Sequence, residues 1–193
     1  MTPLFEFLIT EEGIDKISLV ETPAIGVEFV TLAKQQVFKE TKKGILIGAA
    51  LIPDKPIYRV ADDGREYYGY FSKDTVRLIA ERYMENHRQD QWNVDHDKDV
   101  TGVVMLESWI VEGENDKSKN YGFDVPEGTW MISVKVKNEE VKKQILEENR
   151  IKGFSIEGAF ELRKVEQQIE AKVQERIETM LKDVLVDRLK SLS

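Results

Sequence analysis

A change in residue pattern near position 164 most constrains how this chain folds. From Lys164 to Ser193 the sequence contains no glycine, proline or aromatic residue, and apolar residues recur at helical spacing among charged ones. The preceding residues are divided into short apolar runs by glycines and prolines. We therefore predict a folded domain over residues 1–163, followed by an amphipathic helical segment over residues 164–193.

The first segment has the pattern of a mixed α+β domain in which strands dominate. Ser72 is a predicted N-cap for a helix that buries Val76, Ile79 and Tyr83 on one face, and Asn138 is a predicted cap for a shorter helix. Residues 112–127 are charged and contain glycine, which predicts a surface loop. Alternating or β-branched runs predict strands at residues 5–10, 13–20, 27–32, 44–52, 67–71, 92–97, 100–111 and 128–136.

The composition narrows the classes of function. The net charge of −8 lacks the basic bias that neutralises phosphates, so we expect no nucleic-acid partner. No apolar run approaches the roughly 20 residues that span a bilayer, and the N-terminus lacks the pattern of a signal peptide. The absence of cysteine excludes a thiolate nucleophile, and two histidines exclude a three-histidine zinc site within one chain.

Ser155 and His96 are the residues most suited to chemistry. Gly153 and Gly158 flank Ser155 and permit close backbone approach, which suits a nucleophile; the alternative is a strand end with an ordinary buried hydroxyl. His96 lies between Asp95 and Asp97, so a carboxylate is available to orient the ring of a general base. The alternatives for His96 are a solvated loop residue or a metal ligand.

Other candidates have weaker patterns. His87 lies at the end of a predicted helix, where a histidine is usually a surface residue. Ser108 is a rival nucleophile within an apolar strand. The acidic spacing at residues 95, 97 and 99 suggests a carboxylate-rich metal hydrolase, although the glycine and glutamate of a calcium-binding loop are missing.

Six segments, taken in order, resemble the capsid-maturation (prohead) proteases of tailed phages, in the branch of prophage serine proteases. The resemblance covers about residues 13–161. The segments are ISLVETPA (17–24), LIPDKPIYR (51–59), NVDHD (93–97), ESWIV (107–111), GTWM (128–131) and KGFSIEG (152–158).

The resemblance implies a β-barrel-like protease domain with flanking helices, similar in fold to the herpesvirus assembly protease. It implies that Ser155 is the nucleophile and His96 the base. The third residue of the family lies in the strand motif that ends in Pro-Ala, where this chain has Lys16 and Ser18. Asp15 is the nearest acid and is our predicted third residue, with Glu157 as the alternative.

The same resemblance implies that the protein cleaves scaffold, major capsid protein and itself inside the assembling prohead, in the host cytoplasm. It implies no cofactor and no metal. Assembly proteases are often joined to scaffold-like helices, so we expect self-association through residues 166–190 or packing of that helix on the domain. A non-catalytic scaffold protein with this fold, acting through that helix, is the alternative function.

Overall fold

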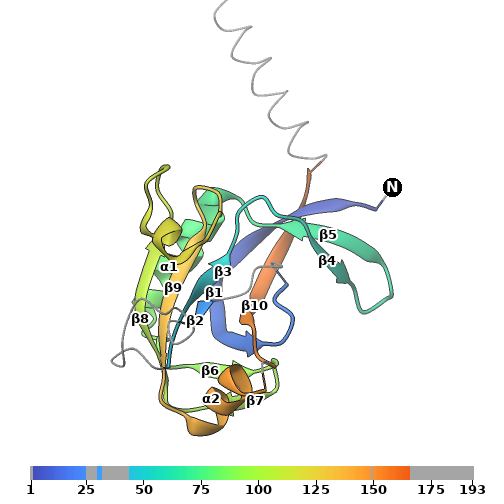
Figure 1. Ribbon diagram of the computed structural model, residues 1–193. Coiled ribbons are helices and arrows are strands. Elements are labelled where there is room, and N and C mark those ends of the chain that lie inside the picture. The colour runs from blue at the N-terminus through green and yellow to red at the C-terminus, as the bar shows by residue number, and fades with distance from the viewer. Residues whose placement is uncertain (1, 25–29, 32–43, 149, 166–193) are drawn as a thin grey trace, which may run out of the picture.

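The computed structural model describes the chain except residues 1, 25–29, 32–43, 149 and 166–193 (Figure 1). The described residues form one mixed sheet, one antiparallel sheet and two α-helices, so the predicted α+β class is confirmed. The predicted helix over residues 164–193 lies almost entirely outside the described residues. Within the described part of the chain, neither helix has the length and hydropathy needed to cross a membrane.

The first sheet is organised around one long strand, β1 (Leu4–Val20). One edge of β1 pairs in parallel with β5 (Glu66–Tyr70) near its start and with β6 (Trp92–Val94) near its end. The other edge pairs antiparallel with β10 (Gly153–Lys164) along most of its length. Strands β4 (Ile57–Val60) and β7 (Lys98–Val100) extend the sheet beyond β5 and β6.

The second sheet has the order β2-β3-β9-β8. Its central strand, β9 (Trp130–Val136), buries both faces, because Trp130 and Ile132 contribute to the main core while Met131 packs in a second apolar cluster. Phe123, from the predicted surface loop, covers that second cluster. The other strands are β2 (Val30–Thr31), β3 (Ile45–Leu51) and β8 (Val103–Ile110).

The expectation of a β-barrel-like domain is wrong in one respect, because the sheets are not closed into a barrel. Closure requires the outermost strands of a sheet to pair with each other. Among the described strands, β4 and β7 end the first sheet and pair only with β5 and β6. The two sheets instead pack against each other through apolar side chains, including Leu19 and Phe154 from the first and Trp130 from the second.

The two α-helices begin at the predicted caps. Helix α1 (Lys73–Glu85) has Ser72 as its N-cap, whose hydroxyl accepts a hydrogen bond from the backbone of Thr75. It packs against β1, β8 and β9. Helix α2 (Glu139–Leu146) starts after Asn138, and the loop 112–127 contains a short 3₁₀ helix, η1 (Lys117–Tyr121). Helix α2 packs against β9.

Candidate active site

The register of three strands places polar residues side by side at the end of β1. Ser18 lies opposite Asn93 on β6 and opposite Ser155 on β10. Ile17 and Leu19, on either side of Ser18, are buried in the core, so alternation directs Ser18 to the opposite face of the sheet. Because directly opposed residues point to the same face, Ser155 shares that face with Ser18.

His96 reaches this face from the tight turn between β6 and β7. Asp95 and His96 both have positive φ, at 53° and 61°, and the Asp97 N–H donates to the Val94 carbonyl across the turn. Left-handed backbone at two consecutive non-glycine residues is uncommon and costs about 1–2 kcal/mol per residue. The Asp95 carboxylate accepts a hydrogen bond from the Glu21 N–H and lies 3.6 Å from Arg150. The turn is therefore held in a strained shape that carries the imidazole.

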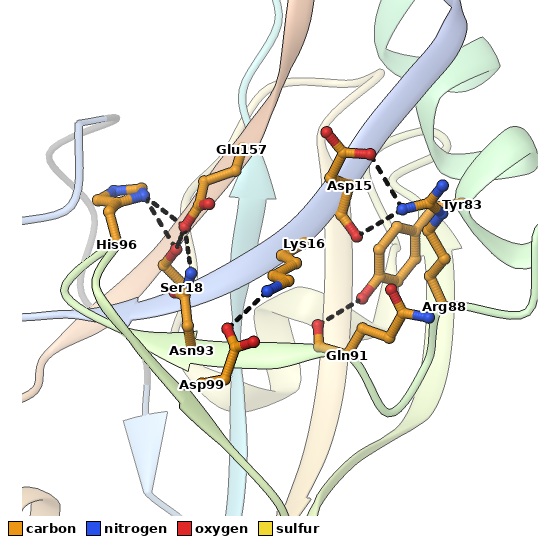
Figure 2. A network of polar contacts seen from close by, with 10 residues as sticks. All are labelled: Asp15, Lys16, Ser18, Tyr83, Arg88, Gln91, Asn93, His96, Asp99 and Glu157. Carbon is orange, nitrogen blue, oxygen red and sulfur yellow. Dashed lines mark hydrogen bonds and ion pairs between the residues drawn. The ribbon is translucent and has the colours of Figure 1, made fainter.

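Three side chains converge on one oxygen atom of Glu157 (Figure 2). The Oε1 atom lies 2.8 Å from Nδ1 of His96 and accepts hydrogen bonds of 2.5 Å from the Ser18 hydroxyl and from Nδ2 of Asn93. Ser18 Oγ also lies 3.0 Å from the same imidazole nitrogen. Since an ionised carboxylate has no proton to donate, we assign the imidazole proton to Nδ1. In neutral His96, Nε2 then carries the lone pair that a general base needs.

The environment favours the ionised form of Glu157. Partial burial alone would raise the pKa of this carboxyl group, but hydrogen bonds from Ser18, Asn93 and His96 outweigh burial and hold the pKa below its ordinary value. The Asn93 Oδ1 atom is buried and has no hydrogen-bond partner in the described part of the chain. A buried polar atom without a hydrogen bond usually lowers stability by about 1–3 kcal/mol. Rotating the Asn93 amide would not avoid this loss, because it would place Oδ1 against the Glu157 carboxylate.

Ser155 lies at the boundary between the polar cluster and a cavity of about 520 Å³. Its residue exposure is 9%, whereas Ser18 is completely buried at 0%. Ser155, Glu157 and Gly158 form one wall of the cavity. Gly158 permits the close contact of β10 with β1 there, since a Cβ atom would lie 2.7 Å from the Gly13 carbonyl oxygen.

The two acids named from the sequence have different surroundings. The Asp15 carboxylate binds the guanidinium of Arg88 at 3.0 Å on the exposed side of β1. Glu157, which was the alternative, is the acid in contact with His96. Lys16 lies opposite Glu157 in the register and pairs with Asp99 at 2.6 Å.

The other sequence candidates lie outside this cluster. Ser108 Oγ accepts a hydrogen bond of 2.9 Å from the indole nitrogen of Trp130. His87 is exposed and has a φ of 55° just after α1. In the described part of the chain, no three or more histidine, cysteine, aspartate or glutamate side chains are arranged to hold a metal ion. The Asp99 and Asp95 carboxylates instead pair with Lys16 and Arg150.

Ser18 and Asn93 are the site residues that sequence reasoning missed. Both lie between buried apolar neighbours on their strands, so the spacing assigns them to the face opposite the core. That pattern alone does not distinguish a site residue from a solvated one. Their importance depends on the parallel pairing of β1 with β6, which joins segments about 75 residues apart in the sequence.

Comparison with known proteins gave one match. The family model described as "Putative phage serine protease XkdF" matches residues 56–164, which is more than half of the 193-residue chain. The matched segment contains Asn93, His96, Ser155 and Glu157, whereas Ser18 precedes it. No curated protein and no solved structure matches the chain significantly.

Proposed function

Since the chain belongs to the phage serine protease family, we propose that it is a serine endopeptidase with Ser155 as nucleophile, His96 as general base and Glu157 as the acid that orients His96. The observation that carries this proposal is the 2.8 Å contact between Glu157 and Nδ1 of His96, beside a cavity whose wall includes Ser155. An acid on one imidazole nitrogen leaves the other nitrogen for the nucleophile, which is the arrangement of a catalytic triad.

Ser18 also contacts His96, but three features favour Ser155 over Ser18 as the nucleophile. Ser18 is fully buried, so a peptide carbonyl has no route to its hydroxyl. Its hydroxyl proton is donated to Glu157 rather than to a base. It approaches the same imidazole nitrogen as the acid, and one nitrogen cannot hold its proton for Glu157 while accepting another. We assign Ser18 as a positioning residue.

The reaction is acyl transfer followed by hydrolysis. Nε2 of His96 removes the Ser155 proton as Oγ attacks the substrate carbonyl carbon, and Glu157 stabilises the imidazolium that forms. His96 then protonates the leaving amine, and water attacks the acyl-enzyme with the same imidazole as base. Backbone N–H groups near residues 153–157 are the proposed donors to the oxyanion.

The substrates that fit the family are the phage's own assembly proteins. We propose that the protein cleaves scaffold protein, major capsid protein and itself within the assembling prohead of the host cell. A protease of this kind requires neither metal nor cofactor for the steps above. The carboxylate-rich metal hydrolase has less support, because Asp99 and Asp95 pair with Lys16 and Arg150.

Incubation of the purified chain with the scaffold and major capsid proteins of the same phage tests this proposal. We expect fragments by mass spectrometry for the wild type and for Ser108→Ala, a matched strand serine outside the cluster. We expect none above background for Ser155→Ala or His96→Ala. Cleavage by Ser155→Ala at the wild-type rate, or sensitivity to a chelator, would contradict the proposal. Absence of cleavage in every sample would favour the non-catalytic scaffold protein.

A further inference from the structure

The cavity beside Ser155 is lined from both faces of strand β10. Phe154 and Ile156 pack on the main core, whereas Ser155 and Glu157 face the polar cluster, and all four line the cavity. Successive side chains of a strand point to opposite faces, so a cavity that touches both sets passes along the strand edge. Among the described strands β10 pairs with β1 alone.

The remainder of the cavity is mainly apolar. Its walls include Ile57 from β4, Tyr67 from β5, and Phe160 and Leu162 from the C-terminal half of β10. Two charged residues occur among the described lining residues, Arg59 and Glu157. The Glu157 carboxylate is occupied by the polar cluster, and Arg59 is exposed on β4 with its guanidinium donating to the Tyr58 carbonyl. The interior therefore offers contacts to an apolar group rather than to a charged one.

We propose that this cavity is the specificity subsite of the enzyme and binds a large apolar or aromatic side chain of the substrate. The inference rests on the proposed function, since it takes Ser155 as the point of cleavage. The cavity is continuous with Ser155, so a peptide bond held at this hydroxyl directs a neighbouring side chain towards Ile57, Tyr67 and Phe160. The pocket supplies the selectivity among substrate side chains.

The volume is consistent with this occupant. About 520 Å³ lies within the range of about 300–1,000 Å³ that is common for ligand sites, and exceeds what one leucine or phenylalanine side chain fills. One missing methylene in an apolar pocket changes kcat/KM by roughly 10–200-fold. We therefore expect phenylalanine or leucine to be preferred over alanine by at least about tenfold, and over aspartate by more.

The experiment is a positional-scanning library of octapeptides, with cleavage by the full chain followed by mass spectrometry. Leu162→Asp introduces a carboxylate at the cavity wall, and the side chain it replaces is 47% exposed, which limits the effect on folding. Leu106→Asp is the matched control, because Leu106 is 51% exposed on β8 and does not line the cavity. We expect Leu162→Asp to lose the tenfold apolar preference and Leu106→Asp to retain it.

Binding to Ser155→Ala separates this inference from the proposed function. Fluorescently labelled octapeptides with phenylalanine, alanine or aspartate at the selected position are titrated against this variant, alone and combined with Leu162→Asp. We expect at least tenfold tighter binding of the phenylalanine peptides, lost in the double variant. Equal binding of the three peptides, with wild-type cleavage intact, overturns the subsite and leaves the proposed function standing. Tighter binding of the aspartate peptide also overturns the subsite, because it would assign recognition to Arg59. Selective binding without wild-type cleavage keeps the subsite and overturns the protease.

Discussion

The Glu157 carboxylate on β10 contacts the imidazole of His96, which lies 61 positions earlier in the turn between β6 and β7, at 2.8 Å from Oε1 to Nδ1. Glu157 lies two residues after Ser155 on β10, and alternation puts both side chains on one face. The strand that provides the proposed nucleophile therefore also provides the acid. The position opposite Glu157 on β1 is Lys16.

We predict that Glu157→Gln lowers kcat much more than it raises KM. The amide keeps the shape of the side chain but loses the charge that stabilises the imidazolium, and the loss in comparable triads is up to about 10⁴-fold in kcat. Steady-state kinetics on a cleaved octapeptide would measure it. Asp15→Asn is the control that separates the two acids, since Arg88 holds Asp15 outside the cluster. A larger loss for Asp15→Asn than for Glu157→Gln would restore Asp15 as the third residue.

The lowered pKa of Glu157 predicts a stability difference that depends on pH. A carboxyl group whose pKa is lower in the folded protein adds stability above its unfolded pKa, about 4.3, and loses that contribution as the pH falls through the folded value. The free energy of unfolding of the wild type, relative to Glu157→Gln, should therefore be largest at neutral pH and shrink below about pH 4.3. Urea unfolding between pH 7 and pH 3 measures this difference. A difference in unfolding free energy that grows as the pH falls would contradict the hydrogen bonds assigned to the Glu157 carboxylate.

We predict that Ser18→Ala retains part of the activity. The substitution removes one hydrogen bond to Glu157, and such bonds to charged groups contribute about 1.5–3 kcal/mol, which corresponds to a loss of roughly 10–100-fold in kcat. Ser155→Ala should lose far more. Comparison of kcat for the two variants at matched pH is the measurement. Equal and complete loss in Ser18→Ala, with activity left in Ser155→Ala, would exchange their roles.

We predict that replacing Gly158 with alanine lowers both the stability and the activity of the protein. In Gly158→Ala the new Cβ would lie 2.7 Å from the Gly13 carbonyl oxygen and 2.8 Å from Cα of Ile14, both backbone atoms that move only with the strand. Overpacking of this kind typically costs about 1–3 kcal/mol. Urea unfolding of Gly158→Ala should show this loss together with reduced kcat. Unchanged stability would mean that β1 and β10 separate there at little cost.

The elements that were predicted most accurately are those that depend on residues close together in the sequence. Ser72 and Asn138 begin the two α-helices as expected, because a cap depends on residues only three positions away. Residues 5–10 and 13–20 were predicted as separate strands, yet they form the single strand β1, since irregular pairing with β10 between Ile9 and Lys16 absorbs the glycine-containing interruption. Strands β4 and β7 were not predicted; both are short, and most of their residues are exposed.

His96 could be predicted from the sequence because side chains able to act as a general base are rare in it. A chain with two histidines and no cysteine offers few bases, which made His96 the natural candidate. The partners of His96 depend on long-range register instead: Ser18 meets Asn93 and Ser155 only because β1 pairs with β6 and β10 at once. Neighbouring sequence gave no indication that Asp15 would face Arg88 while Glu157 faced the imidazole.

Active-site labelling tests the central claim most directly. The full chain would be treated with a fluorophosphonate, which reacts with activated serine hydroxyls, and the modified peptide identified by mass spectrometry. Ser155 and Ser18 lie in different segments, so the labelled residue is unambiguous. We predict a single adduct on Ser155 that is lost in His96→Ala and persists, at a reduced rate, in Ser18→Ala. An adduct on Ser18, or peptide cleavage with no labelled serine, would contradict the account.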